Sequence, residues 1–124
     1  MKHQTILFIF LILSSIAYTQ NKGQLNFEKK VIDFGEVKEN TIAQKTISFK
    51  NSGDQNVIID SIKTTGHIKI EKFPKRPIPP KDEEEITILY NTKKIGPIRR
   101  TITVFSDAEN SIVSLKVKGI VVSN

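Results

Sequence analysis

The sequence of 124 residues contains no cysteine and no tryptophan, and its two histidines are His3 and His67. Without cysteine there is no disulfide bond, no thiolate nucleophile and no thiol to carry a lipid near the amino terminus. Structural zinc sites are built from cysteine and histidine ligands, so this sequence argues against one. We therefore expect a fold that depends on its hydrophobic core alone, with no metal and no cofactor.

Aromatic residues are also scarce, at 7% of the chain. Proteins that bind nucleic acid usually combine a basic groove with exposed aromatic rings on which bases stack. The basic residues are dispersed, the net charge of +6 is modest, and Tyr18 and Tyr90 offer no stacking platform. We expect no nucleic-acid binding, and at most a weak attraction to anionic surfaces.

The single long apolar run lies near the amino terminus, at residues 6–13, and follows Lys2. Ser15 and Ala17 then place small residues at the positions that a signal peptidase reads. A membrane-spanning helix needs about 20 apolar residues, and this run is much shorter. The sequence predicts a signal peptide over residues 1–17, an exported protein that is periplasmic or secreted, and no membrane span after cleavage.

Residues 18–124 carry a net charge of +5 once Lys2 is removed, and their length suits a single domain. Their apolar residues alternate with polar ones, most clearly at Val113, Leu115 and Val117. About seven such segments are separated by turn-forming residues, which is typical of a β-sandwich. We predict an all-β fold, an antiparallel β-sandwich of about seven strands with Greek-key connections, and a closed barrel is the alternative.

Two segments modify this pattern. Four prolines fall within residues 74–80, and proline cannot donate to a β-ladder. We expect this Pro-rich segment to cross from one sheet to the other, as a Greek key requires. In residues 56–64 the apolar parity slips between Ile59 and Ile62, which predicts a bulge.

The candidate core follows from the apolar parity of each predicted strand. We expect these side chains to be buried between the two sheets. The nine residues are Phe34, Ile47, Phe49, Ile59, Ile88, Ile102, Val104, Leu115 and Val117.

Four motifs together resemble a known bacterial family. They are Asp-Phe-Gly-Glu-Val at residues 33–37, Thr-Ile-Ser-Phe-Lys-Asn-Ser-Gly at 46–53, Pro-Ile-Pro-Pro at 77–80 and Thr-Ile-Thr-Val-Phe-Ser at 101–106. In order and spacing they resemble the family called domain of unknown function 1573, from Phe27 to Val122. The resemblance implies an exported immunoglobulin-like sandwich, related to major-sperm-protein and cilia-associated domains, whose biochemical function is not established.

The sequence departs from that family at one loop. Many members carry Cys-Gly-Cys after the third main strand, where this chain has Thr65, Gly66 and His67. No thiol-based disulfide, redox or metal role is therefore available to the loop. The shared Gly35 is explained as a strand end, and the turn at residues 51–54 as a first hairpin.

Candidate catalytic residues are few. His67 is the one histidine outside the predicted signal peptide, and no nucleophile-elbow motif surrounds a serine, so we interpret it as a solvated loop residue. Residues 82–85 form an acidic run that matches no known calcium loop, and their side chains alternate between faces. We predict that the protein is not an enzyme and has no catalytic, cofactor-binding or metal site.

Basic residues form two clusters, one along the Pro-rich segment and one around the loop after Asn91. These clusters flank the predicted strand 84–91 from opposite ends, so they need not form one patch. They are our candidates for partner binding: Lys72, Lys75, Arg76, Lys81, Lys93, Lys94, Arg99 and Arg100.

Two functions from different classes fit these features. The first is a non-enzymatic module of the cell envelope, with a structural role or a protein partner bound through loops or a lent sheet edge. The alternative is a binder of glycan or of an anionic envelope polymer. An enzyme is disfavoured by the scarcity of histidine and cysteine.

Overall fold

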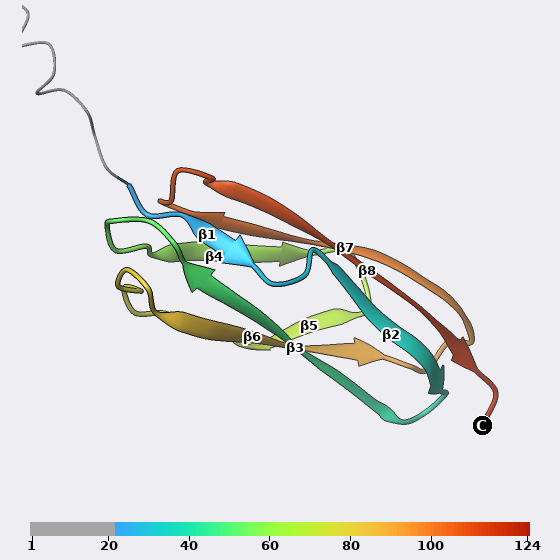
Figure 1. The fold of residues 1–124 in the computed structure, drawn as a ribbon. Coiled ribbons are helices and arrows are strands. Elements are labelled where there is room, and N and C mark those ends of the chain that lie inside the picture. Colours follow the sequence, from blue (N-terminus) through green and yellow to red (C-terminus); the bar gives the residue numbers. More distant parts are fainter. Residues whose placement is uncertain (1–21) are drawn as a thin grey trace, which may run out of the picture.

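The computed structural model describes residues 22–124, and the predicted signal peptide lies outside this range. The described residues form two four-stranded sheets packed face to face (Figure 1). No helix occurs in residues 22–124, so none in this range spans a membrane. The strands are β1 (Leu25–Phe27), β2 (Val31–Lys38), β3 (Ile42–Asn51), β4 (Ile59–Thr64), β5 (Ile68–Lys72), β6 (Glu83–Asn91), β7 (Gly96–Ser106) and β8 (Ile112–Val122).

The two sheets have the strand orders β1-β3-β6-β5, here called sheet A, and β2-β8-β7-β4, called sheet B. This arrangement confirms the predicted sandwich, with eight strands where about seven were expected. The additional strand arises because residues 28–30 carry the chain from sheet A to sheet B and separate β1 from β2. The prediction of a wholly antiparallel fold is wrong at one pair, since β2 runs parallel to β8.

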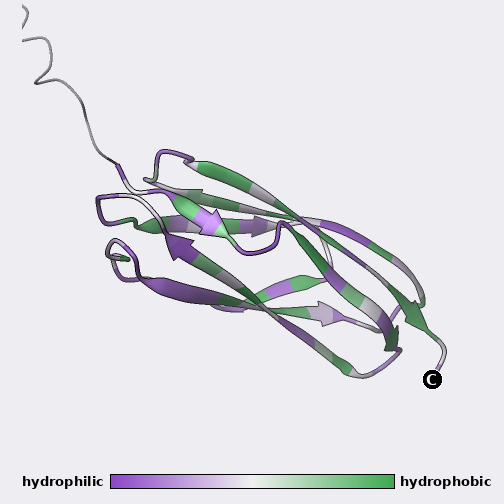
Figure 2. Cartoon of the chain, in the orientation of Figure 1, coloured by the Kyte–Doolittle hydropathy of each residue, from purple (hydrophilic) through white to green (hydrophobic). Residues whose placement is uncertain are grey.

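The core is one hydrophobic cluster to which both sheets contribute. All nine predicted core residues are buried in it. Hydrophobic and hydrophilic residues accordingly alternate along the strands (Figure 2). Burying one large aliphatic side chain contributes about 1.5–3 kcal/mol, so this alternation is the main source of stability in a chain without disulfides.

The Pro-rich segment does not cross between the sheets, contrary to the prediction. It joins β5 to β6, which are antiparallel neighbours in sheet A. The chain changes sheets at other connections, and one of them is residues 52–58 between β3 and β4, where we had expected a hairpin. Turn-forming residues mark where a chain reverses, but they do not identify the strand with which the next segment pairs.

Asn51 organises the end of the sandwich at which the Pro-rich segment lies. This side chain is fully buried, and its Oδ1 accepts from the backbone N–H groups of Gln24 at 3.2 Å and Gly53 at 3.0 Å. Its Nδ2 donates to the backbone carbonyls of Gln55 at 2.8 Å and Ile78 at 2.9 Å. One amide thus fixes the segment before β1, the connection after β3 and the Pro-rich segment together.

Two strands of sheet B contain a shift in register. The register of β4 against β7 shifts between Ile59 and Ser61, which confirms the predicted bulge. We had expected Gly35 to end its strand, and this is wrong, because it lies inside β2 at a register shift against β8. Its backbone has the positive φ, +63°, for which glycine is suited. Gly119 of β8 faces it so closely that a Cβ on Gly119 would lie 2.8 Å from the Gly35 carbonyl oxygen.

Candidate interaction surfaces

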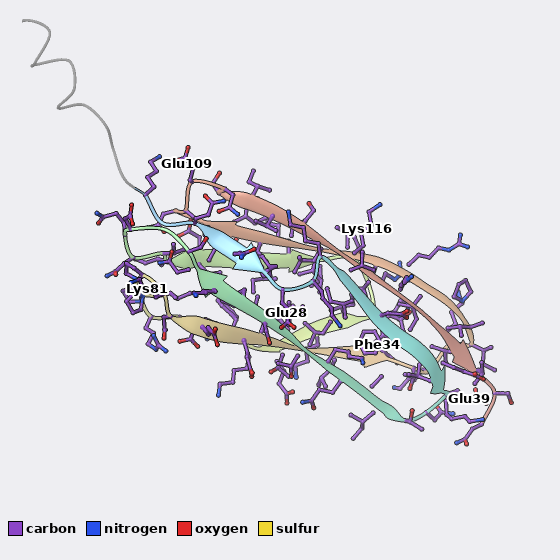
Figure 3. All side chains as sticks on the ribbon, in the orientation of Figure 1. Glu28, Phe34, Glu39, Lys81, Glu109 and Lys116 are labelled. Carbon is purple, nitrogen blue, oxygen red and sulfur yellow. The ribbon has the colours of Figure 1, made fainter. Side chains whose placement is uncertain are left out.

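The two predicted basic clusters lie at opposite ends of the sandwich. The Pro-rich segment precedes β6, and Lys93 and Lys94 follow it. The nine residues of β6 separate the two ends by about 30 Å. Figure 3 marks these ends with Lys81 and Glu39. A separation of this size exceeds the Debye length of about 10 Å at 0.1 M salt, so the clusters act independently.

The cluster near the Pro-rich segment is partly neutralised. Arg76 forms ion pairs with Glu84 and, at 3.7 Å, with Asp82. The ammonium group of Lys75 lies 5.7 Å from the centroid of the Phe73 ring, within cation–π range. Lys81 has φ +70° and donates its backbone N–H to the Asn51 carbonyl, so its position is set by the backbone of the turn.

Lys72 lies outside this cluster, on the outer face of sheet A. It borders a shallow hollow of about 690 Å³ together with Glu28, Glu83, Glu85 and Lys50. The hollow contains both signs of charge. In residues 22–124 no three histidine, cysteine or carboxylate side chains are grouped as metal ligands.

The side chains of β7 point alternately inward and outward, and this separates the two arginines of the second cluster. Arg100 pairs with the buried Val117, so it belongs to the inner parity of the strand and is half-buried. Arg99 belongs to the outer parity and pairs with Lys118 of β8. Lys93 and Lys94 remain exposed in the loop between β6 and β7.

Arg99 instead joins a set of basic residues on the outer face of sheet B. Lys63 pairs with Thr103 and Lys116 with Thr101, so these lysines share the outer face of neighbouring strands with Arg99 and Lys118. We call Lys63, Arg99, Lys116 and Lys118 the basic face. Like charges directly opposite each other on paired strands are destabilising, as at Arg99 and Lys118. An ion pair of 3.9 Å between Asp33 and Lys118 offsets this repulsion only in part.

Sheet A has an incompletely paired strand. β1 pairs with β3 only at residues 49–51, and the Glu28 N–H donates to the Ser48 carbonyl before the chain turns away into β2. On its other side β3 pairs with β6 along its whole length, without a register shift. Within the described chain, residues 42–47 of β3 therefore have a strand partner on one side only. We call this stretch the open edge of β3.

A groove runs beside this edge, between β3 and the start of β2. It encloses about 250 Å³, and its walls include Ile32, Ile47 and Lys45. Pockets for small ligands typically enclose about 300–1,000 Å³, so this groove is below that range. Its volume is small for a compact ligand and comparable to that of a few side chains of an extended peptide.

His67 lies in the exposed loop between β4 and β5. It has φ +67°, and its carbonyl accepts the N–H of Asn91 at 2.8 Å. The imidazole ring lies 6.1 Å from the ring of Tyr90, measured between centroids. Its side chain is exposed in the loop, and its backbone carbonyl links the loop to the end of β6.

The sequence matches the model of one protein family over most of its length. The family model described as "Protein of unknown function (DUF1573)" matches residues 25–121. No curated protein matches this sequence.

Solved structures of the same architecture include proteins from human, a nematode and a bacterium. A PapD-like domain of human CEP192 has a TM-score of 0.68 at 8% identity, covering 83% of this chain and 88% of that one. SSP-19, an MSP-domain protein of Caenorhabditis elegans, has a TM-score of 0.57 at 11% identity, and the match covers 76% of this chain and 97% of that one. The secreted serine protease VesC from Vibrio cholerae scores 0.61 at 12% identity, and the match covers 78% of this chain but 23% of the protease. At these identities the likeness establishes the immunoglobulin-like fold alone.

Proposed function

Since this chain belongs to the DUF1573 family of proteins of unknown function, we propose its function from the surfaces that its sandwich exposes. It is an exported, non-enzymatic interaction module of the cell envelope that binds a protein partner. The predicted signal peptide supports export to the periplasm or the exterior. The immunoglobulin-like fold supports a binding role, because such sandwiches commonly engage partners through loops or sheet edges.

The observation that carries this proposal is the open edge of β3. A sheet edge presents backbone N–H and C=O groups to any extended chain that approaches it, which gives affinity without a deep pocket. The non-enzymatic part of the proposal is supported by His67, which lies exposed in a loop beside the ring of Tyr90.

The test of this function is site-specific crosslinking in envelope extracts. A photo-crosslinking residue replaces Gln44 on the open edge, and a matched variant carries it at Ser114, on the outer face of sheet B. We expect the Gln44 position to capture one defined protein, and the Ser114 position to capture little. Capture of no protein from either position contradicts the proposal, as does a hydrolytic activity that His67→Asn abolishes.

A second function is favoured by the basic face. Arg99 and Lys118 are kept directly opposite each other at a cost in stability, which an anionic polymer bound across the face would offset. This candidate predicts that the protein is retained on immobilised polyphosphate or polygalacturonate and released by salt. Lys116→Gln with Lys118→Gln should abolish that retention, while Lys93→Gln with Lys94→Gln, at the end of the sandwich, should leave it unchanged.

A further inference from the structure

We propose that the open edge of β3 binds an extended segment of the partner as an added strand, and that this segment carries an acidic residue between two apolar ones. The inference rests on the proposed function, because it names the chemistry of the protein partner. It identifies one edge, one register and one complementary charge pattern.

The hydrogen-bonding groups of the edge follow from the alternation of β3. Residues with even numbers face the β1 side, since the Ser52 N–H donates to Gln24 and the Ser48 carbonyl accepts from Glu28. Asn51 faces the other way, towards Asp82. Because the register is regular throughout, the N–H and C=O groups of Gln44 and Thr46 face the open side and can pair with an added strand.

The other sheet edges are less suited to an added strand. β4 and β5 both contain register shifts, and irregular edges resist further pairing. β2 is interrupted by its own irregularity after Asp33, and β1 has three residues. The open edge of β3 combines regular geometry with about 20 Å of length, which is the span of six strand residues.

The side chains of the edge determine what the added strand must carry. Ala43, Lys45 and Ile47 share the inner parity of β3, and Ala43 and Ile47 are buried while Lys45 is exposed. Glu28 and Asp33 also line the groove, but no carboxylate of the described residues lies within 4.0 Å of the ammonium group of Lys45 or of Lys29. An incoming strand therefore meets apolar side chains at two positions and, between them, a lysine that forms no ion pair within the described residues.

Lys45 also explains why the occupant is a different protein rather than a second copy. An inward-pointing lysine on a sheet edge opposes pairing of that edge with itself. Antiparallel pairing of residues 42–47 between two copies would bring both Lys45 side chains to the centre of the new ladder. A carboxylate on the partner strand removes this penalty, so the same residue that excludes self-association selects an acidic segment.

The probe that tests this inference is a capped peptide, Thr-Val-Thr-Glu-Thr-Val-Thr. Its sequence is the same in both directions, so a parallel or an antiparallel strand presents valine, glutamate and valine to Ala43, Lys45 and Ile47. The control peptide has lysine in place of glutamate. Binding is followed by NMR titration and by hydrogen exchange of the Gln44 and Thr46 amides, which should slow when the glutamate peptide binds and stay unchanged with the lysine peptide.

Two variants locate the interaction on the protein. Gln44→Pro removes an N–H that faces the open side and leaves the ladder to β6 intact, so it should weaken peptide binding about tenfold, whereas Gln44→Ala should not. Lys45→Glu should weaken binding of the glutamate peptide by a similar factor and favour the lysine peptide. Lys69→Glu, at the opposite edge of the same sheet, is its control. Should Gln44→Pro fail to fold, Lys45→Glu carries the test.

The outcomes separate this inference from the proposed function. Protection of other amides, equal binding of both peptides, or a dimer that forms through Gln44 and Thr46 overturns the added acidic strand. A partner protein that the Gln44 position captures equally in wild type and Lys45→Glu leaves the interaction function standing and overturns the requirement for an acidic residue in the added strand. Failure of capture together with failure of peptide binding removes both.

Discussion

Asn51 provides the clearest case of a polar residue that the fold requires. Buried polar groups are costly unless they are hydrogen-bonded, and this amide satisfies both its oxygen and its nitrogen twice. Its partners lie before β1, after β3 and in the Pro-rich segment, which are distant in sequence. A single buried residue thereby links three segments in a chain that has no disulfide.

Asn51→Ala should therefore lower the free energy of unfolding by about 2–4 kcal/mol, because it leaves four backbone groups without their partner. Asn26→Ala, at an exposed position of β1, should change it by less than about 0.5 kcal/mol. Urea denaturation of the three proteins measures the difference. Similar values for both variants would mean that the network at Asn51 contributes little.

The alternation of β8 makes an equally sharp prediction for neighbouring residues. Leu115 is fully buried and Lys116 is exposed. Leu115→Ala should cost about 2–5 kcal/mol of stability, while Lys116→Ala should fall within about 0.5 kcal/mol of wild type. Thermal and urea unfolding of both variants provide the check, and equal effects would contradict the assignment of faces.

At the scale of elements, the sequence determined which residues face inward but not which strands are neighbours. Period-two alternation located the nine core residues correctly, because each strand has one buried face. The open edge of β3 was not predictable in this way, since it exists only because residues 28–30 leave sheet A early. The alternation in the sequence places Lys116 and Lys118 on the outer face of β8. Their proximity to Arg99 could not be predicted, because it depends on the register between β7 and β8.

The junction of β2 and β8 is the element most sensitive to a small change. Gly119 has φ +148°, and an added Cβ would lie 2.8 Å from the Gly35 oxygen. Gly119→Ala should lower stability by about 1–3 kcal/mol through backbone strain and through displacement of β2. Gly66→Ala, where an added Cβ meets nothing within 4 Å, should be tolerated. Differential scanning calorimetry of the two variants tests this contrast.

At the scale of the whole molecule, charge contributes little to the stability of the described fold. The four ion pairs within residues 22–124 join largely exposed groups, apart from the Arg76–Glu84 contact, and exposed pairs contribute about 0–1 kcal/mol each. The described fold is held instead by its core and by buried polar groups such as Asn51.

The free energy of unfolding should accordingly change by less than about 1 kcal/mol when sodium chloride is raised from about 0.01 M to about 1 M. Chloride is the appropriate salt, since sulfate stabilises proteins by exclusion from their surface. Binding to the acidic peptide should weaken over the same range. A large change in stability would assign the ion pairs a structural role.

The parallel pairing of β2 with β8 has a mechanical consequence. Residue 22 and residue 124 lie at opposite ends of the sandwich (Figure 1), and both strands run from the first end towards the second. Tension between these two points pulls β2 and β8 in opposite directions along their length, so their hydrogen bonds are loaded together in shear. Tension between residues 95 and 124 acts instead where β7 begins beside the end of β8, and it opens that ladder one pair at a time. The molecule should thus resist stretching along its chain at forces well above those that peel its last strand away.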